Sequence, residues 1–314
     1  MSTENSLSLP PLALIAGPTA SGKSDLAVGL AQALEAKGRR AVVINADSAQ
    51  VYADLAVLSA RPSEAEMGGI VHRMFGEWDG AVACSAADWA ARAREVIAEV
   101  HAAVGVPILV GGTGLYLRTL LDGIAPVPAI DPAVRENVRS LPLAEAFAVL
   151  LREDPDRAAL LAPADSARIS RALEVVRSTG RTLTEWQREK IGRIGGAVQL
   201  HPLVLLPDRE TLYAKCDARF AAMLENGAIE EVRALLARKL DPALPVMRAI
   251  GVPEIAGYLS GEWSLDEARL RGAQATRSYA KRQYTWFRRQ PPDHWPRVEK
   301  DYVVDGIFAS LLRN

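Results

Sequence analysis

Eight residues near the start of the chain restrict its fold more than any other feature. Residues 17–24 read GPTASGKS and satisfy the pattern G-x-x-x-x-G-K-[ST] of a phosphate-binding loop. The apolar run LALIAG precedes the loop, and the Ala- and Leu-rich segment 25–36 follows it with apolar positions three and four apart. A strand, a glycine-rich turn and a helix in this order direct backbone N–H groups and a helix N-terminus at an anion. The sequence therefore predicts a P-loop.

Each residue type in this loop helps to hold phosphate. The two glycines let the backbone turn tightly, Lys23 supplies a cation, and the Ser24 hydroxyl is a predicted Mg²⁺ ligand. The loop alone does not distinguish a mononucleotide from a non-nucleotide diphosphate. The predicted phosphate-binding residues are Gly17, Pro18, Thr19, Ala20, Ser21, Gly22, Lys23 and Ser24.

Strand and helix patterns alternate after the P-loop. AVVINAD at 41–47 and PILVGG at 107–112 are typical of buried strands, and a helix is expected between them at about 86–104. Helical patterns then continue to about residue 189, one further strand is expected at 204–207, and helices follow. Because strands separated by helices form parallel sheets, we predict an α/β fold with a P-loop NTPase-like core.

The same pattern predicts the organisation of the chain. A proline-punctuated segment at 121–132 ends the regular alternation of strands and helices. We expect a helical insertion and a helical C-terminal portion. The predicted parts are a disordered tail at 1–10, the core with its C-terminal helices at 11–122 and 200–314, and the insertion at 123–199.

Composition excludes several classes of protein. The formal net charge of −1 gives no overall attraction to nucleic acid, so any such attraction must come from local clusters. The two cysteines, Cys84 and Cys216, lie far apart and form no zinc-binding pattern. The N-terminus does not resemble a signal peptide, and no apolar run is long enough to span a bilayer. We therefore expect a cytoplasmic protein that does not contact a membrane.

Asp47 and Thr113 each allow several roles. Asp47 closes the second predicted strand and begins the run DSAQVY. It could hold Mg²⁺ through water, cap a turn, or act as a general base toward a nucleophile. Thr113 lies between glycines at the end of the third predicted strand. It could cap the N-terminus of a helix or contact a substrate. These residues by themselves leave the alternatives open.

A basic tract follows near the C-terminus. Residues 268–292 contain seven basic side chains and no acidic one. Tyr279, Tyr284, Trp286 and Phe287 lie between the basic residues. A charge run is commonly a solvated helix face, but arginines interleaved with aromatic residues also suit phosphate contacts and base stacking.

The order of the motifs is more specific than any one of them. GPTASGKS, DSAQVY, LVGGTGLYLRTLL, RALEV, RAIG and ATRSYAKRQYTWFR follow one another along the chain. In this combination the chain resembles the tRNA dimethylallyltransferases (tRNA isopentenyltransferases) of bacterial type, over about residues 12–289. Members of that family transfer a dimethylallyl group from dimethylallyl diphosphate to N6 of adenosine 37, next to the tRNA anticodon.

The resemblance implies a role for each motif. Asp47 would be the base toward N6, Thr113 would contact the reacting groups, and the P-loop would hold the diphosphate of the donor with Mg²⁺. Residues 58–63 read LSARPS where the family usually has Gly-Thr-Ala-Lys-Pro. The partners implied are the tRNA anticodon arm and dimethylallyl diphosphate, and we expect a monomer. The implied tRNA-binding residues are Asp47, Ser48, Ala49, Gln50, Thr113, Arg135, Arg168, Arg171, Arg248 and Arg282, with Arg248 also implied in diphosphate binding.

Two other classes share the P-loop. A small-molecule or nucleoside kinase would have the same sheet and a helical lid, but no segment here marks an adenine-binding site for ATP. An RNA-binding NTPase would need a residue that positions water for hydrolysis, and none can be identified from the sequence. We therefore expect no requirement for ATP.

Overall fold

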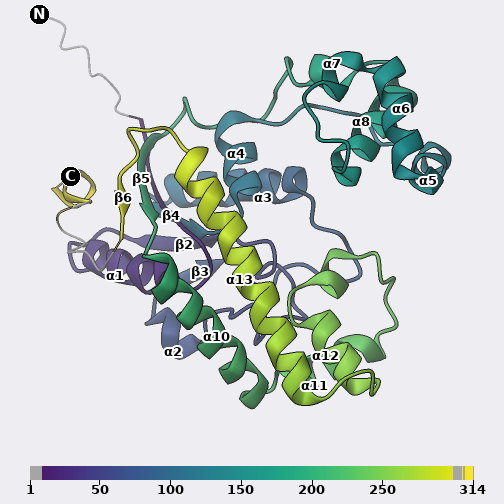
Figure 1. Cartoon of the computed structure of the whole chain (residues 1–314). Helices are drawn as coiled ribbons and strands as arrows, with labels where there is room; N and C mark the ends of the chain where they lie inside the picture. Colours follow the sequence, from purple (N-terminus) through teal and green to yellow (C-terminus); the bar gives the residue numbers. More distant parts are fainter. Residues whose placement is uncertain (1–8, 300–305, 307, 314) are drawn as a thin grey trace, which may run out of the picture. The chain divides into compact units, whose positions relative to one another are not determined.

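Six parallel strands form one sheet in the order β3-β2-β4-β1-β5-β6 (Figure 1). The structure, a computed structural model, describes residues 9–299, 306 and 308–313. The predicted α/β class with a parallel sheet is confirmed. The strands are β1 (Pro11–Ala16), β2 (Ala41–Asn45), β3 (Val71–Arg73), β4 (Val106–Gly111), β5 (Gln199–Leu205) and β6 (Arg297–Val298).

The sequence analysis did not identify the two edge strands. β3 has three residues and β6 has two, and both are largely half-buried or exposed, so neither produces the apolar run of an internal strand. β5 begins five residues before the predicted strand, because it pairs with β1 along the whole length of that strand, from Pro11 opposite Gln199 to Ala16 opposite Val204.

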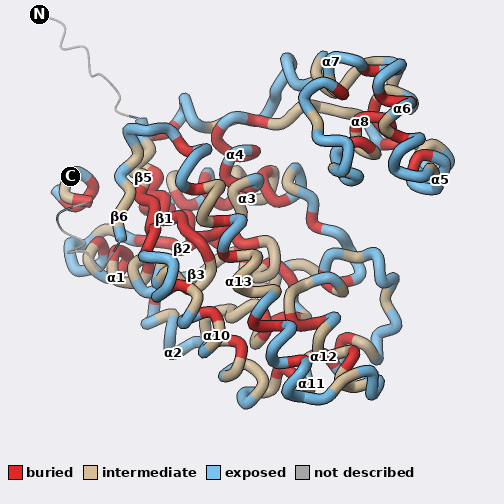
Figure 2. Tube along the Cα trace, in the orientation of Figure 1, coloured by how far each residue is buried: buried red, intermediate tan, exposed pale blue. Residues whose placement is uncertain are grey.

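The side chains of β1 divide between two cores, one on each face of the sheet. Figure 2 shows that the strands in the middle of the sheet are buried. Leu12 and Leu14 belong to the larger core, which also receives side chains from α3, α4 and α13. Ala13 and Ile15 belong to the other core, which α1 covers. Because alternate residues of a strand point to opposite faces, an internal strand covered on both sides is apolar throughout.

The helices of the core follow the predicted order. α13 has 25 residues and begins with a capping box in which Ser264 and Glu267 bond each other's backbone N–H groups. It packs against α10 and α12. The helices are α1 (Lys23–Glu35), α2 (Glu64–Met67), α3 (Ala86–Ala102), α4 (Gly114–Asp122), α10 (Arg209–Glu225), α11 (Ala228–Ala237), the 3₁₀ helix η1 (Pro245–Arg248), α12 (Val252–Leu259), α13 (Leu265–Arg289) and α15 (Ala309–Arg313).

Residue contacts divide the chain into two compact units. Unit 1 comprises residues 1–121 and 194–314, and unit 2 comprises residues 122–193. The predicted insertion at 123–199 overlaps unit 2, while residues 194–199 fall in unit 1, where the Ile194 N–H donates to the carbonyl of Leu120.

Unit 2 is helical and has a core of its own. Ala146 and Leu150 of α6 pack with Ile169 and Leu173 of α8. Ile124 and Ile191 pair across an isolated antiparallel bridge at the ends of the unit. Its helices are α5 (Pro132–Ser140), α6 (Leu143–Glu153), α7 (Pro155–Ala158), α8 (Ser166–Thr179) and α9 (Leu183–Trp186).

Two expectations concern the ends of the chain and the membrane. Most of the predicted disordered tail, residues 1–8, lies outside the described residues. Within the described residues, no helix combines the length and the apolar character needed to cross a bilayer.

Candidate active site

The GPTASGKS segment forms a tight loop between β1 and α1. Gly22 has a φ of 88°, which L side chains rarely adopt, and it immediately precedes the first residue of α1, Lys23. A Cβ on Gly17 would lie 2.6 Å from the Leu205 carbonyl oxygen and 3.0 Å from Ser21 Oγ. The first glycine is therefore required by close approach to β5, and the second by the backbone turn.

A cavity of about 490 Å³ opens in front of this loop. Lys23 lies at its wall, where the ammonium Nζ donates to the Pro18 carbonyl at 3.2 Å. Burial lowers the pKa of Lys23 to about 8, although the negative charge of Asp47 opposes this shift. Ser21 Oγ is buried and has no hydrogen-bond partner. A half-buried cation and an unpaired hydroxyl in one loop favour an anionic ligand.

Asp47 follows β2 and is held by its neighbour Asn45. The Asn45 amide, which is fully buried, accepts from the Asp47 N–H at 2.8 Å and donates to the Asp47 carbonyl at 3.0 Å. Asp47 Oδ1 accepts from the Ala49 N–H at 2.9 Å, which is an Asx-turn. Asp47 therefore caps a turn, which is one of the roles that its sequence position allows, but only one of its two carboxylate oxygens takes part.

Thr113 lies beside the same turn. Its hydroxyl accepts from the Ser48 N–H at 2.9 Å and donates to the Ser48 hydroxyl at 3.2 Å. Tyr279 of α13 lies beside Thr113 and Ser48. Burial, followed by the charge of Asp47, raises the pKa of its phenol, and the hydroxyls of Thr113 and Ser48 oppose this rise. Segments far apart in the sequence thus meet around Asp47.

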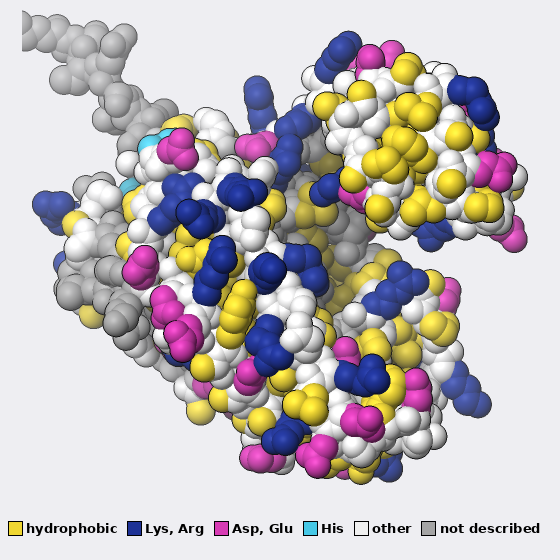
Figure 3. Space-filling view, viewed as in Figure 1, with side chains coloured by type: hydrophobic (Ala, Val, Ile, Leu, Met, Phe, Trp, Pro, Cys, Tyr) yellow, Lys and Arg dark blue, Asp and Glu magenta, His cyan; other side chains and the backbone are white. Residues whose placement is uncertain are grey.

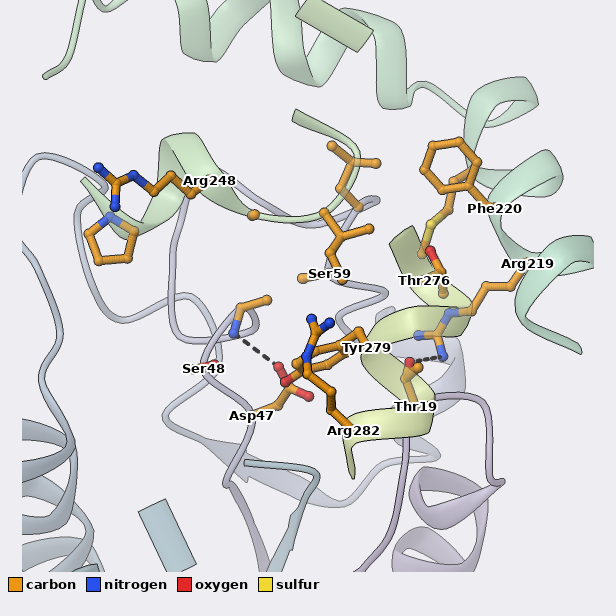
Figure 4. Close-up of a pocket in the computed structure, with 16 residues that line it drawn as sticks. Thr19, Asp47, Ser48, Ser59, Arg219, Phe220, Arg248, Thr276, Tyr279 and Arg282 are labelled. Atoms are coloured by element: carbon orange, nitrogen blue, oxygen red, sulfur yellow. Dashed lines mark hydrogen bonds between the residues drawn. The ribbon is translucent and has the colours of Figure 1, made fainter. Parts of the chain in front are cut away.

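A second cavity, of about 300 Å³, contains Asp47. Figure 4 shows Asp47, Ser48, Tyr279 and Arg282 on one side of this cavity, with Phe220 and Arg219 from α10 across from them. The wall combines these polar groups with apolar side chains. The apolar side chains that line it are Leu58, Phe220, Met223, Pro245, Ala249 and Ile250, with Ala49 beside the carboxylate.

Arg219 is a site residue that the sequence analysis missed. It lines both cavities, and its guanidinium lies 3.5 Å from Thr19 Oγ1 of the P-loop. Burial lowers its pKa, and the charge of Asp47 opposes that shift. A signal was available, because Arg219 falls among Leu212, Cys216 and Phe220 on the buried stripe of α10, where a charge needs a partner.

The positions of Gln50 and Arg248 do not match the adenine-binding and diphosphate-binding roles that the resemblance implies for them. Gln50 lines neither cavity, and its amide donates to the carbonyls of Ser59 and Ala60 at 3.1 and 2.8 Å. Arg248 is exposed at the end of η1 and lines the Asp47 cavity rather than the P-loop cavity. Its position favours a contact with the nucleic acid over one with the diphosphate.

The loop at 55–61, which includes part of the LSARPS departure, separates the two cavities. Leu58 and Ser59 line the Asp47 cavity, while Val57 and Ala60 line the P-loop cavity. The carboxylate of Glu231 on α11 accepts from the N–H groups of residues 56, 57 and 58 at 2.6, 2.8 and 2.9 Å. Hydrogen bonds with the side chains of Gln50 and Glu231 therefore fix the position of this loop.

The basic tract lies on α13, and Figure 3 shows Lys and Arg side chains along the course of this helix. Arg282, Arg288 and Arg289 are exposed. Among the four aromatic residues of the tract, Phe287 is fully buried in the main core and is therefore not available for base stacking. Trp286 also packs inward, since a Cβ on Gly114 would lie 2.4 Å from its ring.

The three implied RNA-binding arginines of unit 2 lie on two of its helices. Arg135 is on α5, while Arg168 and Arg171 are on α8. Arg168 pairs with Asp165 at 2.9 Å, and Arg171 approaches Glu174 at 4.0 Å. The positive charge of Arg135 contributes, after burial, to a lowered pKa of Arg171. These residues belong to a different unit from Asp47.

Comparison with known proteins bears on this geometry. The family of IPP transferases matches residues 50–290. The chain belongs to this family. Proteins from Erythrobacter litoralis and Novosphingobium aromaticivorans, both named tRNA dimethylallyltransferase, are 66% and 64% identical to it. These matches cover 97% and 88% of this chain, and 96% and 99% of the relatives.

Solved structures of IPP transferases have the same fold. A tRNA isopentenylpyrophosphate transferase from Bacillus halodurans has a TM-score of 0.68 at 30% identity, covering 96% of this chain and 94% of its own. A eukaryotic dimethylallyltransferase described as acting on tRNA has a TM-score of 0.73 at 29% identity, covering 88% and 69%. The family and the enzyme class predicted from the order of motifs are confirmed.

Proposed function

We propose that the two adjoining cavities bind the two substrates of a prenyl transfer to tRNA. The enzyme moves the dimethylallyl group of dimethylallyl diphosphate to N6 of adenosine 37, and it releases diphosphate. The observation that carries this proposal is that Arg219 and Met223 line both the P-loop cavity and the cavity that Asp47 lines. The predicted anion site and the Asp47 carboxylate therefore line adjoining cavities.

The P-loop cavity suits the diphosphate of the donor. Loop N–H groups, the N-terminus of α1, Lys23 and Arg219 would take the negative charge that develops as the carbon–oxygen bond breaks. The buried hydroxyl of Ser21 would gain a phosphate oxygen as its partner. Apolar side chains at the junction of the cavities, such as Met223 and Leu58, would cover the dimethylallyl group.

Mg²⁺ fits this arrangement as a partner of the diphosphate. The described residues hold no cluster of three or more His, Cys, Asp or Glu side chains that could bind a metal alone. Mg²⁺ is commonly bound by one or two protein oxygens together with substrate phosphates. Ser24, whose exposed side chain lines the P-loop cavity, would supply one such oxygen. When bound, the ion would withdraw charge from the leaving diphosphate.

Asp47 is assigned as the base toward the adenine. The lone pair of N6 is delocalised into the ring, so a carboxylate that accepts a proton from N6 makes it a better nucleophile. Asp47 Oδ1 already accepts from the Ala49 N–H, and Oδ2 is the oxygen that we assign to the N6 proton. Ser48 and Thr113 hold the turn in place.

The tRNA must present its adenine outside the anticodon stack, because the base has to enter a pocket. Arg248 and Arg282 line that pocket, and Arg288 and Arg289 continue the positive face of α13. We assign these arginines, with Arg135, Arg168 and Arg171 of unit 2, to phosphates of the anticodon arm. Function in the cytoplasm, as a monomer, is part of this proposal.

One assay tests the proposal against the other P-loop classes. Unmodified tRNA is incubated with dimethylallyl diphosphate and Mg²⁺, and separately with ATP, and the RNA mass and released phosphate are measured. We expect the RNA to gain one dimethylallyl group with the donor and no phosphate release with ATP. Release of phosphate from ATP that tRNA stimulates, without prenylation, would contradict the proposal.

A further inference from the structure

We propose that Gln283 of α13 is a positioning residue for the transfer reaction, because it ties the P-loop to the loop that carries Thr113. Its Oε1 accepts from the Thr19 N–H at 2.8 Å. Its Nε2 donates to the Gly112 carbonyl at 2.9 Å. The side chain is 5% exposed and thus lies between the two loops rather than in solvent. This inference rests on the proposed function.

The chemistry of the two partners requires an amide at this position. A backbone N–H can only donate and a backbone carbonyl can only accept, so the orientation of the Gln283 amide is fixed by its partners. Glutamate in its ionised form could accept from Thr19 but could not donate to Gly112. Lysine could donate but could not accept. The residue therefore does more than fill space.

The glycines around Thr113 are shaped to receive this helix. A Cβ on Gly112 would lie 2.3 Å from Gln283 Nε2, and a Cβ on Gly114 would lie 2.4 Å from the Trp286 ring. Tyr279 lies beside Thr113 itself, close enough for the Thr113 hydroxyl to affect the pKa of its phenol. Residues 279, 283 and 286 are four and three apart, which places them on one face of α13. One helix face thus contacts three consecutive residues and sets the position of Thr113.

The consequence for the reaction is geometric. Thr19 belongs to the loop that we assign to the donor, and Thr113 hydrogen-bonds to Ser48 beside the assigned base. Gln283 therefore sets the separation of the donor loop and the acceptor loop. A misplacement of about 1 Å between reacting groups can cost about 10²-fold in rate. The same helix carries Arg282, Arg288 and Arg289, which are assigned to tRNA.

Two variants of similar size test this role. Gln283→Met removes both hydrogen bonds, and we expect kcat to fall about 10- to 100-fold, with a tRNA KM close to that of the original protein. Gln283→Glu keeps the acceptor for Thr19 but can donate to Gly112 only when its carboxyl is protonated. Burial and the facing carbonyl raise the pKa of such a carboxyl. Its rate relative to the original protein should therefore rise as the pH falls from about 8 to about 6.

The controls separate this role from a folding defect and from failure of the proposed function. Gln290→Met, an exposed substitution at the end of the same helix, should leave kcat unchanged. Thermal unfolding of each variant shows whether it is folded. A Gln283→Glu rate ratio that is flat with pH, or a Gln283→Met variant as fast as the original protein, would contradict the proposal.

A second readout does not depend on prenyl transfer. Gln283→Met should bind inorganic diphosphate about 3- to 10-fold more weakly, because Thr19 is no longer fixed; this range is an order-of-magnitude expectation. If the original protein transfers no dimethylallyl group, the proposed function fails, and this titration still decides the role of Gln283. Unchanged diphosphate affinity in that case would contradict a positioning role.

Discussion

At the scale of single residues, the assignment of Asp47 separates a base from a metal ligand. Asp47→Asn keeps the shape of the side chain and an acceptor for the Ala49 N–H, but it removes the charge and the ability to take a proton. We expect donor and tRNA binding to change little, while the single-turnover rate falls by about 10²–10⁴-fold. The rate is measured at saturating substrates over a series of Mg²⁺ concentrations. Recovery of the rate at high Mg²⁺ would instead indicate a metal ligand.

Lys23 gives a second prediction at this scale, in the form of a pH dependence. Its pKa is lowered to about 8 in the free protein, so it is charged below that pH and becomes neutral above it. The affinity for dimethylallyl diphosphate should therefore fall as the pH rises above about 8, by at most about tenfold per unit, with proton uptake on binding. Calorimetric titration in two buffers of different ionisation enthalpy measures both effects.

The control for this prediction is Lys23→Met, which should bind more weakly but with little pH dependence in the same range. The same lowered pKa has a consequence for stability without donor. Between about pH 8 and the ordinary value of 10.5 the unfolded chain binds more protons at this residue than the folded one, so stability should rise with pH there. An identical pH profile for Lys23→Met and the original protein would assign the dependence to another group.

At the scale of elements, α13 carries residues that we assign to both substrates. Its inner face holds the Thr113 loop, Arg282 lines the Asp47 cavity, and Arg288 and Arg289 are exposed farther along the helix. We expect tRNA affinity to fall steeply with salt. Replacement of these three arginines by Ala should flatten the log–log slope by up to about 0.7–0.9 for each phosphate that the variant no longer neutralises. Donor affinity should stay unchanged. Equilibrium binding over a salt series measures the slope.

A matched control for this element is Arg233→Ala on α11, an exposed arginine outside the proposed tRNA face. It should leave the slope as it is. If the triple replacement on α13 also leaves the slope unchanged, these side chains are solvated and bind no phosphate, and the tRNA-binding face must be sought elsewhere.

At the scale of the whole molecule, the two units contribute different interactions. The core of unit 2 is separate from the sheet, so we expect its arginines to affect tRNA without affecting the donor. Replacement of Arg135, Arg168 and Arg171 by Ala should weaken tRNA binding and reduce its salt dependence, while the dissociation constant for dimethylallyl diphosphate stays the same. Arg152→Ala, an exposed arginine on α6, is the control. Loss of donor binding in the triple variant would contradict this division.

Local sequence patterns were sufficient to predict most of the fold. The internal strands are apolar because both faces of the sheet are covered, so β1, β2 and β4 could be predicted from their composition, and β5 only at its buried end. The edge strands β3 and β6 could not, since a strand of two or three partly exposed residues has no such pattern. The P-loop could be predicted because its glycines, lysine and serine are adjacent in the chain.

The sequence by itself determined the family through the order of its motifs, and it predicted the P-loop, Asp47 and Thr113 as site residues because each of these lies within one short motif. Only the tertiary structure decided which distant side chains complete the site. Arg219 and Gln283 belong to helices far from the P-loop in sequence, yet both reach Thr19. It also decided which aromatic residues of α13 face inward, as Phe287 and Trp286 do. Such packing depends on how helices lie against the sheet, and no local pattern encodes it.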